Sequence, residues 1–384
     1  MTGASNSNNS TSLHAACAIV FILFVFIYLF FFQSDLLFMV QHVLSGGATH
    51  YDRLIGAIVI TAVLYLVYAG AKRLYSFKGG LYAVNFFPSL LLLTALTGVD
   101  SDFRGNPFSE VWIWLTPSLL VIYVLLALFL RYVDASRPHE NTSVQGITEL
   151  WRGLLLMSVM FILVCICANS NRTFHYRLRV ERLLSSGSFA KALEVGNKSD
   201  DTDASLTMLR IYALSNQKQL GERLFEYPVT GGSAALLPGG DSVRCLFYPE
   251  NRIVRALSIR RKGSMKPMEY LLYVEKNGLA MKPVTDYILC GYLLDKNLDA
   301  FVSFVKHCYN LSSPSLPKHY REALTLYTHL RSSPVLVYHN EVMDADYADF
   351  QKLEIRYADK RERASYVRDN YGGTYWFYYF YKQI

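Results

Sequence analysis

The sequence has few charged residues and carries none of the short motifs that commonly mark an enzyme. Only 18% of its residues are charged, against roughly a quarter in a typical soluble protein. No GxSxG nucleophile elbow, phosphate-binding P-loop, GxGxxG dinucleotide fingerprint or HExxH zinc motif occurs. These absences exclude the enzyme families that the motifs define, and we assign no cofactor to the chain.

Patterns that bind metal ions or nucleic acids are also missing. None of the six cysteines forms a CxxC pair, and no block of Lys and Arg with interleaved aromatic residues occurs. We therefore expect neither a metal site nor a nucleic-acid partner. The net charge of +7 comes largely from the second half of the chain and suits an anionic lipid surface or an acidic partner.

Apolar residues, in contrast, are abundant in the first half. A membrane-spanning helix needs roughly 20 mostly apolar residues. Five segments meet this requirement: 15–32, 54–71, 81–99, 111–130 and 150–168. We therefore predict a bundle of about five transmembrane helices over residues 15–169, after a polar tail at 1–14 and before a soluble domain at 170–384.

Basic residues in the short connections set the predicted orientation, because they are retained on the cytoplasmic side. One side of the predicted bundle carries six, namely Lys72, Arg73, Lys78, Arg131, Arg137 and Arg152. The other side carries two, Arg53 and Arg104. The N-terminus is thus predicted to be cytoplasmic. Five crossings place the C-terminal domain outside, and a miscount by one helix would reverse that placement.

Polar residues of the first half gather in two outward loops. The interiors of spans two to five carry no acid or base, which disfavours a pump or an ion-coupled transporter subunit. Asp35, Asp100 and Asp102 in the outward loops are the candidates for an acid/base or metal-assisted site at the membrane surface. Ordinary loop polarity with helix caps is the alternative, and we favour it because no HxxxH-like ligand spacing accompanies the acids.

The second half reads as a series of short amphipathic helices. Apolar residues recur at i, i+3, i+4 and i+7, as in Tyr320, Ala323, Leu324 and Tyr327. Helices of this length in antiparallel pairs predict an all-α, tetratricopeptide-like solenoid of helical hairpins, although the strict residue pattern of that repeat is not met. A long loop at 230–251 is predicted to interrupt the array.

Eight aromatic residues lie between Tyr371 and Tyr381, at the end of the sequence. Aromatic side chains dominate the packing of helices, so this stretch predicts a terminal core helix. The alternative is a strip that contacts a partner or the membrane interface.

Five stretches carry a resemblance: QHVLSGGATHYDR, KALEVGNK, DKNLDAFVSF, LPKHYREALTLY and GGTYWFYYFY. They resemble a family of uncharacterised multi-pass membrane proteins of Bacteroidota bacteria, a domain of unknown function. The resemblance implies a bacterial inner-membrane location with the helical domain in the periplasm. The family has no assigned activity, so it transfers no functional residue.

Three functions remain open. We expect a membrane-anchored periplasmic scaffold that binds a protein or peptide through its C-terminal helical domain, because helical arrays present extended concave surfaces. The alternative is a membrane enzyme that acts on a lipid-linked substrate at the outer face, as glycosyltransferases do, with Asp35, Asp100 and Asp102 as its candidate residues. A transporter subunit is the least favoured.

Overall fold

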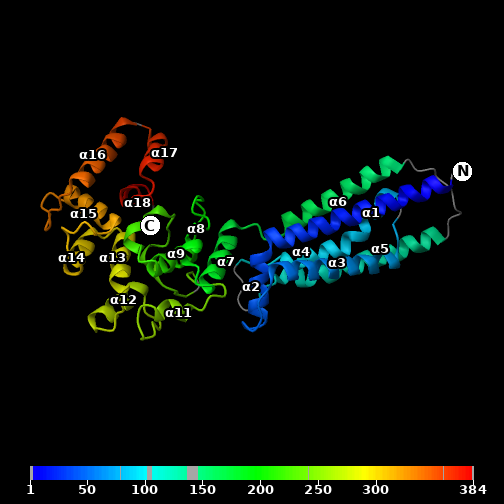
Figure 1. Cartoon of the computed structure of the whole chain (residues 1–384), viewed down its shortest axis with the longest axis horizontal. Coiled ribbons are helices and arrows are strands. Elements are labelled where there is room, and N and C mark those ends of the chain that lie inside the picture. The colour runs from blue at the N-terminus through cyan, green and yellow to red at the C-terminus, as the bar shows by residue number, and fades with distance from the viewer. Residues whose placement is uncertain are drawn as a thin grey trace. The chain divides into compact units, whose positions relative to one another are not determined.

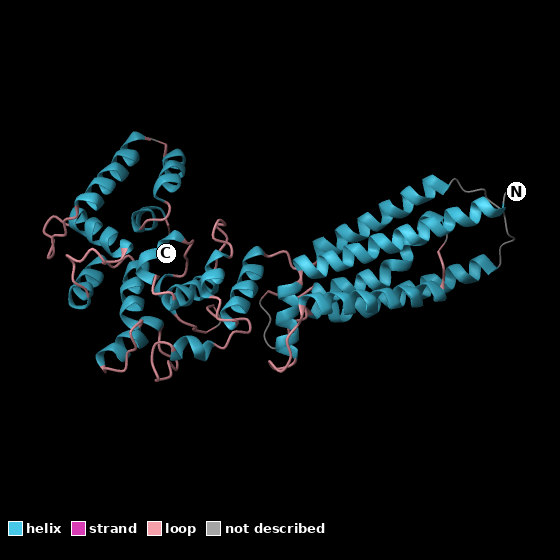
Figure 2. Cartoon of the chain, viewed as in Figure 1, coloured by secondary structure: helices cyan, strands magenta, loops and turns pink. Residues whose placement is uncertain are grey.

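The chain folds into helices that are joined by loops. The computed structural model describes residues 3–77, 79–101, 106–135, 146–240, 242–357 and 359–382. Within those ranges β-structure is limited to two isolated bridges, and loops connect the helices (Figure 2). The predicted all-α fold class is confirmed. The chain divides into two compact units, Met1–Asn171 (unit 1) and Arg172–Ile384 (unit 2).

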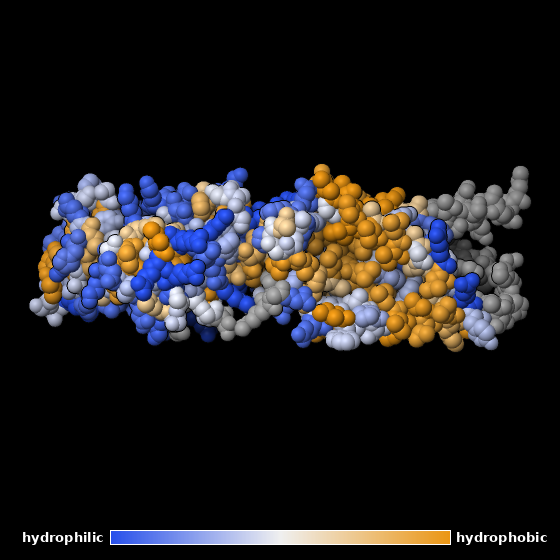
Figure 3. All heavy atoms as spheres, turned by 90° about the horizontal axis from the view of Figure 1, so that it is seen from below, coloured by the Kyte–Doolittle hydropathy of each residue, from blue (hydrophilic) through white to orange (hydrophobic). Residues whose placement is uncertain are grey.

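Among its described residues, unit 1 contains four helices that are long and apolar enough to cross a membrane. Its elements are α1 (Gly3–Ile27), η1 (Tyr28–Phe32), α2 (Ser34–Leu44), α3 (Arg53–Leu74), η2 (Gly79–Phe86), α4 (Phe87–Thr97), α5 (Glu110–Ala135) and α6 (Gly146–Cys167). The four candidate spans are His14–Phe32, Arg53–Leu74, Glu110–Val133 and Thr148–Cys167. Only 17% to 28% of the residues in their most apolar stretches are buried, so most apolar side chains face outward, as the hydrophobic surface in Figure 3 shows.

The predicted span at 81–99 differs from the other four, because it is not one long α-helix. Its first part is the 3-10 helix η2, and α4 follows with only 11 residues. Pro88 lies in the first turn of α4, where its missing N–H leaves no helical hydrogen bond unmade, and it does not kink a longer helix. Most residues of α4 are buried, and η2 and α4 pack on α3, α5 and α6. The segment is therefore apolar because it forms the interior of unit 1.

This inner segment nevertheless runs beside α1 from His14 to the end of that helix. At one end the ring of His14, in α1, stacks on Tyr82 of η2, with ring centroids 3.8 Å apart. At the other end Tyr28, which follows α1, donates a hydrogen bond to Thr97 at the end of α4 (3.3 Å). Eight 3-10 residues and eleven α-helical residues together rise about 30 Å, which matches the apolar thickness of a bilayer.

Two further contacts show how the remaining helices alternate in direction. Arg131 of α5 lies beside the end of α3, where it donates to the carbonyl of Leu74 (3.5 Å). Asn169, just after α6, donates to the carbonyl of Val99 beyond α4 (2.9 Å). Five segments thus run along unit 1 in alternating directions, and the start of α1 lies at the opposite end from the end of α6 (Figure 1).

Unit 2 is an array of helices in which most helices pack on their neighbours in sequence. The helices of its first part are α7 (Arg172–Ser185), α8 (Phe189–Glu194), α9 (Ala204–Asn216), α10 (Leu220–Arg223), η3 (Leu224–Glu226), η4 (Gly232–Leu236) and α11 (Glu250–Arg255). Those of its second part are α12 (Pro267–Lys276), α13 (Val284–Leu294), α14 (Leu298–Cys308), α15 (Lys318–Leu330), α16 (Glu341–Arg356), α17 (Lys360–Tyr371) and α18 (Tyr375–Tyr381). Their inner faces share one apolar core.

Four helix ends in unit 2 share the same turn. The residue after the C-cap has a left-handed backbone in each, at Gly187, Lys218, Gly278 and Lys296. The next N–H then bonds to a carbonyl five residues back: Ser188 to Leu183, Gln219 to Leu214, Leu279 to Val274 and Asn297 to Tyr292. This Schellman geometry ends one helix and directs the chain back along it, so α7–α8, α9–α10 and α13–α14 form similar hairpins.

Replacing Lys218 with glycine is expected to raise the free energy of unfolding by about 0.5–1 kcal/mol, because glycine has no Cβ to clash in a left-handed backbone. Lys296→Gly is the matched control. Lys296 has the same backbone angle, but its Nζ donates to the carbonyl of Lys382 (2.6 Å), so the substitution also removes a contact. Urea unfolding of the full chain in an uncharged detergent measures both. An equal gain in the two variants would contradict this account.

The aromatic C-terminal helix α18 lies in the interior of unit 2. Tyr375 and Trp376 are buried, and the helix packs on α15 as well as on α17. The hydroxyl of Tyr378 donates to the carbonyl of Leu294 at the end of α13 (2.7 Å). The expected core helix is therefore present, but it folds back between earlier helices of the array (Figure 1).

Candidate functional site

The acids predicted for unit 1 lie at one end of its bundle. Asp35 is in the first turn of α2, and Asp100 follows α4. Gln33 and Thr97, close to them in sequence, both contact Tyr28, so the two acids lie at the same end. Asp102 lies outside the described residues. Among the described residues, no group of three or more His, Cys, Asp or Glu side chains is arranged to hold a metal ion.

A further acid of the same loop region acts as a helix cap. The carboxylate of Asp52 accepts hydrogen bonds from the N–H groups of Leu54 (2.9 Å) and Ile55 (2.8 Å) at the start of α3. An N-terminal cap of this kind uses the carboxylate to bond N–H groups that have no partner within the helix. The cap interpretation of the loop acids therefore holds for Asp52.

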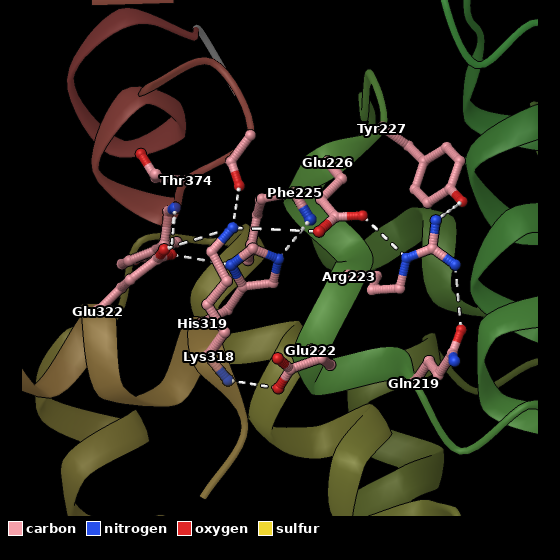
Figure 4. A network of polar contacts seen from close by, with 12 residues as sticks. Gln219, Glu222, Arg223, Phe225, Glu226, Tyr227, Lys318, His319, Glu322 and Thr374 are labelled. Carbon is pink, nitrogen blue, oxygen red and sulfur yellow. Dashed lines mark hydrogen bonds and ion pairs between the residues drawn. The ribbon is translucent and has the colours of Figure 1, made fainter. Parts of the chain in front are cut away.

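A network of polar contacts lies in unit 2, at the start of α15 (Figure 4). His319 and Glu322 are both buried there, and Nδ1 of the histidine lies 2.8 Å from Oε2 of the glutamate. The same Oε2 accepts the N–H of Tyr375 (2.7 Å), and the carbonyl of Glu322 accepts the indole N–H of Trp376 (2.8 Å). Nε2 of His319 accepts the N–H of Phe225 (3.2 Å). The network thus joins η3, α15 and α18.

A histidine beside a carboxylate is also the arrangement of a general base, but here both ring nitrogens are occupied. Because Nε2 accepts the N–H of Phe225, the ring proton is on Nδ1 and is donated to Glu322. A catalytic base needs one nitrogen directed at a substrate. The His319–Glu322 pair therefore connects three segments of the fold and has no nitrogen left for catalysis.

Charged residues around this pair hold the segment that follows α10. The guanidinium of Arg223 donates to Gln219 (3.1 Å), Glu226 (2.9 Å) and the hydroxyl of Tyr227 (2.9 Å). On the other side, Nζ of Lys318 donates to the carbonyl of Gly373 (3.2 Å). Glu226 and Tyr227 are consequently held in defined positions beside α18.

A buried arginine, Arg210, also holds this region in place. Arg210 of α9 is only 1% exposed, and its guanidinium donates to the carbonyls of Pro228 (3.2 Å), Gly196 (3.3 Å) and Val195 (3.5 Å). Burial lowers the pKa of Arg210 to about 10, so the group remains charged at neutral pH. The arginine therefore ties the loop after α8 to the chain after η3.

A second buried carboxylate, on α7, organises the long loop. Glu181 is fully buried, and it accepts the N–H groups of Leu246 (2.7 Å), Phe247 (2.8 Å) and Tyr248 (2.8 Å). Burial raises the pKa of Glu181, while the three N–H groups and Arg177 act in the opposite direction. Its bonds all go to the main chain, so it fixes the shape of the loop.

Asp286 forms a third polar cluster, on α13. Its Oδ1 accepts the hydroxyls of Tyr309 (2.7 Å) and Tyr320 (2.9 Å). The thiol of Cys290 lies 3.7 Å from the Tyr320 hydroxyl, and burial raises the pKa of that thiol far above its usual value. A thiol that keeps its proton is a poor nucleophile, so this cluster joins α13, α14 and α15 without offering a reactive group.

The segments that Arg210 and the His319–Glu322 pair hold in place line a cavity of about 190 Å³. Its walls are the loop 197–200, the segment 225–229, the turn before α18 and α18 itself. Arg210 ties the first two walls together, and the His319–Glu322 pair ties the second wall to α18. At the rim, Arg368 pairs with Asp200 (3.4 Å). This cavity is the candidate functional site of unit 2.

Sequence reasoning gave His319 no functional role, and the structure places it in the core. It did not single out Glu181, Arg210 or Glu322. The position of Glu322 could have indicated its burial, because it adjoins the apolar face that Tyr320, Ala323 and Leu324 define. A charged residue in such a place is buried only when it has hydrogen-bond or ion-pair partners. The identity of those partners required the fold.

Residues 264–382 match a family of unknown function (DUF6057). The matched region includes α12 to α18, and thus His319 and Glu322, but not the segment 225–229 or Arg210. No curated protein and no solved structure matches the chain. Over roughly its last third, therefore, the chain is similar to an uncharacterised family, whereas its predicted bacterial source stays a prediction.

Proposed function

We propose that this protein is a membrane-anchored binding protein whose unit 2 holds a segment of a peptide or of another protein. The observation that carries the proposal is the cavity of about 190 Å³, whose walls are fixed by buried ionisable groups. Binding sites are most effective when packing and hydrogen bonds hold their walls in place before the ligand arrives. Arg210 and the His319–Glu322 pair supply that rigidity.

The size and lining of the cavity favour a peptide over a cofactor. Sites for drug-sized ligands typically enclose about 300–1,000 Å³, so this cavity suits a single side chain or a chain end. Its lining combines the aromatic rings of Tyr227 and Phe377 with opposite charges, Asp200 and Glu226 against Lys382. Peptides offer both apolar side chains and charged groups to such a surface.

The hairpins of unit 2 support the same function. The shared left-handed turn after α7, α9 and α13 gives the regular hairpins that a tetratricopeptide-like solenoid requires, and such arrays bind peptides on their inner side. The segments that wall the cavity, η3 and α18, lie between helices of this array. We therefore take these hairpins as support for a peptide site in this cavity.

The proposed location is a bacterial inner membrane, with unit 1 as the anchor and unit 2 in the periplasm. Five segments run along unit 1, and the start of α1 and the end of α6 lie at opposite ends. Lys72, Arg73 and Arg131 are at the end where α1 starts, which favours a cytoplasmic N-terminus. A reporter that is active only in the periplasm, fused after Ile384, should be active. Activity of a cytoplasmic reporter there would contradict this orientation.

The binding proposal can be tested with peptides selected from a displayed library on the full chain in an uncharged detergent. Asp200→Arg reverses a charge at the rim of the cavity and should weaken the selected peptides about tenfold or more, which corresponds to about 1.4 kcal/mol. Asp299→Arg is the matched control, because Asp299 is also an exposed partner of an arginine, Arg331, but lies on α14. Peptides that bind both variants equally would show that the cavity is not the site.

The alternative function, an enzyme acting on a lipid-linked substrate, depends on the acids of unit 1. Asp35→Asn, Asp100→Asn and Asp102→Asn are each expected to change stability by no more than about 0.5 kcal/mol and to leave any cellular phenotype nearly intact, as loop charges do. Complementation of a deletion strain, with membrane abundance measured in parallel, tests this. A variant that is abundant but inactive would support the enzyme and contradict the binding proposal.

A further inference from the structure

A second cavity of unit 2 is lined by a cluster of basic side chains. It has a volume of about 430 Å³ and lies against α11 and the segment that follows it. Its cations are Arg255, Arg260, Arg261 and Lys262, and Glu250 is its lining carboxylate. Figure 3 shows strongly hydrophilic residues gathered on the visible face of unit 2. A concave surface with this excess of positive charge attracts anions.

The protein itself neutralises little of this charge. Oε1 of Glu250 accepts the main-chain N–H of Cys245 (3.0 Å), so part of its charge serves another contact. In the parts of the chain that the structure describes, no carboxylate forms an ion pair with Arg255, Arg261 or Lys262. Lys262 is also half-buried, which makes its positive charge costly, and the attraction of Glu250 offsets only part of that cost. A bound anion would offset that cost.

The segment that carries the cations is held in a defined shape. The hydroxyl of the buried Tyr270 donates to the carbonyl of Arg260 (2.7 Å), and the N–H of Met281 donates to the carbonyl of Leu257 (2.8 Å). The guanidinium of Arg260 lies over the ring of Tyr273, 4.6 Å from its centroid. These contacts with α12 and the α12–α13 connection position the basic side chains before any ligand binds.

We propose that this cavity binds a phosphate group. A guanidinium matches two phosphate oxygens with two parallel N–H groups, and an ammonium adds a point charge, so three arginines and a lysine suit this anion. The phosphate belongs either to a soluble compound or to the headgroup of an anionic lipid. Ile259, which is 89% exposed on the rim among the cations, gives a lipid an apolar contact as well.

The test uses the full chain in an uncharged detergent and three probes measured by titration calorimetry. The probes are inorganic phosphate, short-chain phosphatidylglycerol and short-chain phosphatidylcholine, whose phosphate is neutralised by its own choline. Arg255→Gln combined with Arg261→Gln removes two exposed charges of the cavity. Lys306→Gln combined with Arg361→Gln removes two exposed charges from α14 and α17 and serves as the matched control.

The cavity variant should bind its ligand at least about tenfold more weakly than the wild type, a loss of about 1.4 kcal/mol. The control variant should bind as the wild type does. If inorganic phosphate binds to the wild type and is weakened only in the cavity variant, a soluble phosphate is enough to occupy the cavity. If phosphatidylglycerol binds in this way and inorganic phosphate does not bind, the ligand is the lipid headgroup. Circular dichroism of each variant shows whether it has folded.

Two results would overturn the proposal: no binding of either anionic probe at millimolar concentration, or an equal loss in the cavity variant and the control. The proposal is independent of the peptide site. Asp200→Arg, which alters the rim of the first cavity, should leave phosphate binding unchanged. Failure of one proposal therefore leaves the other standing.

Discussion

Replacing Glu322 with alanine is expected to lower the free energy of unfolding of unit 2 by about 3–5 kcal/mol, the range for breaking a buried charged contact from one side. Oε2 of Glu322 accepts two hydrogens, from Nδ1 of His319 and from the N–H of Tyr375. Alanine leaves both donors buried without an acceptor. Each unsatisfied donor costs about 1–3 kcal/mol. The start of α18 would lose its bond to α15.

Two controls separate the hydrogen bonds from the charge. Glu322→Gln keeps a carbonyl oxygen where Oε2 lies, so it should cost only about 1–2 kcal/mol. Glu341→Ala removes an exposed glutamate at the start of α16 and should cost no more than about 1 kcal/mol. Urea unfolding followed by circular dichroism and tryptophan emission measures all three in the full chain. Trp376 is the one tryptophan of residues 172–384 and is bonded to Glu322, so its contribution to the emission of the four tryptophans reports on this site.

Local patterns in the sequence predict the helices well, but they do not predict whether an apolar helix lies in the interior or faces outward. Amphipathic spacing predicts α15, which the structure places at Lys318–Leu330. The apolar run at 81–99 shows the limit, because its side chains are apolar whether they face lipid or other helices. Only the packing of η2 and α4 on α3, α5 and α6 shows that this run is interior. Its 3-10 start at Gly79–Phe86 has no periodic signal of its own.

The candidate site was even less accessible to sequence reasoning, because its parts lie far apart in the chain. The aromatic run Tyr375–Tyr381 predicts a core helix, and that prediction is confirmed. Its partners could not be predicted, since His319 contacts Phe225 across 94 positions and Tyr375 contacts Glu322 across 53. Such contacts depend on how all the helices of unit 2 pack together. In the sequence, a buried acid can be noticed only because it interrupts the apolar face of a predicted helix.

Replacing Glu181 with glutamine should be nearly as damaging as replacing it with alanine, in contrast to Glu322. Three main-chain N–H groups share its two oxygens: Oε1 accepts the N–H of Leu246, and Oε2 accepts those of Phe247 and Tyr248. Glutamine keeps one acceptor and turns an NH2 group toward at least one of these donors. We therefore expect both Glu181→Gln and Glu181→Ala to lower the free energy of unfolding by about 3–5 kcal/mol.

The difference between the two glutamates follows from the number of oxygens that each one uses in hydrogen bonds. Glu322 accepts both hydrogens through Oε2, and its Oε1 forms only a long ion pair with Lys318 (3.9 Å), whereas Glu181 accepts hydrogen bonds through both oxygens. Urea unfolding of the four single variants, with Glu341→Gln as the control for loss of a charge, gives the comparison. A small loss for Glu181→Gln, similar to that of Glu322→Gln, would show that a single oxygen at position 181 is enough to hold the long loop. Arg177, which donates to the carbonyl of Arg244 in the same loop (3.0 Å), would then be the residue that fixes it.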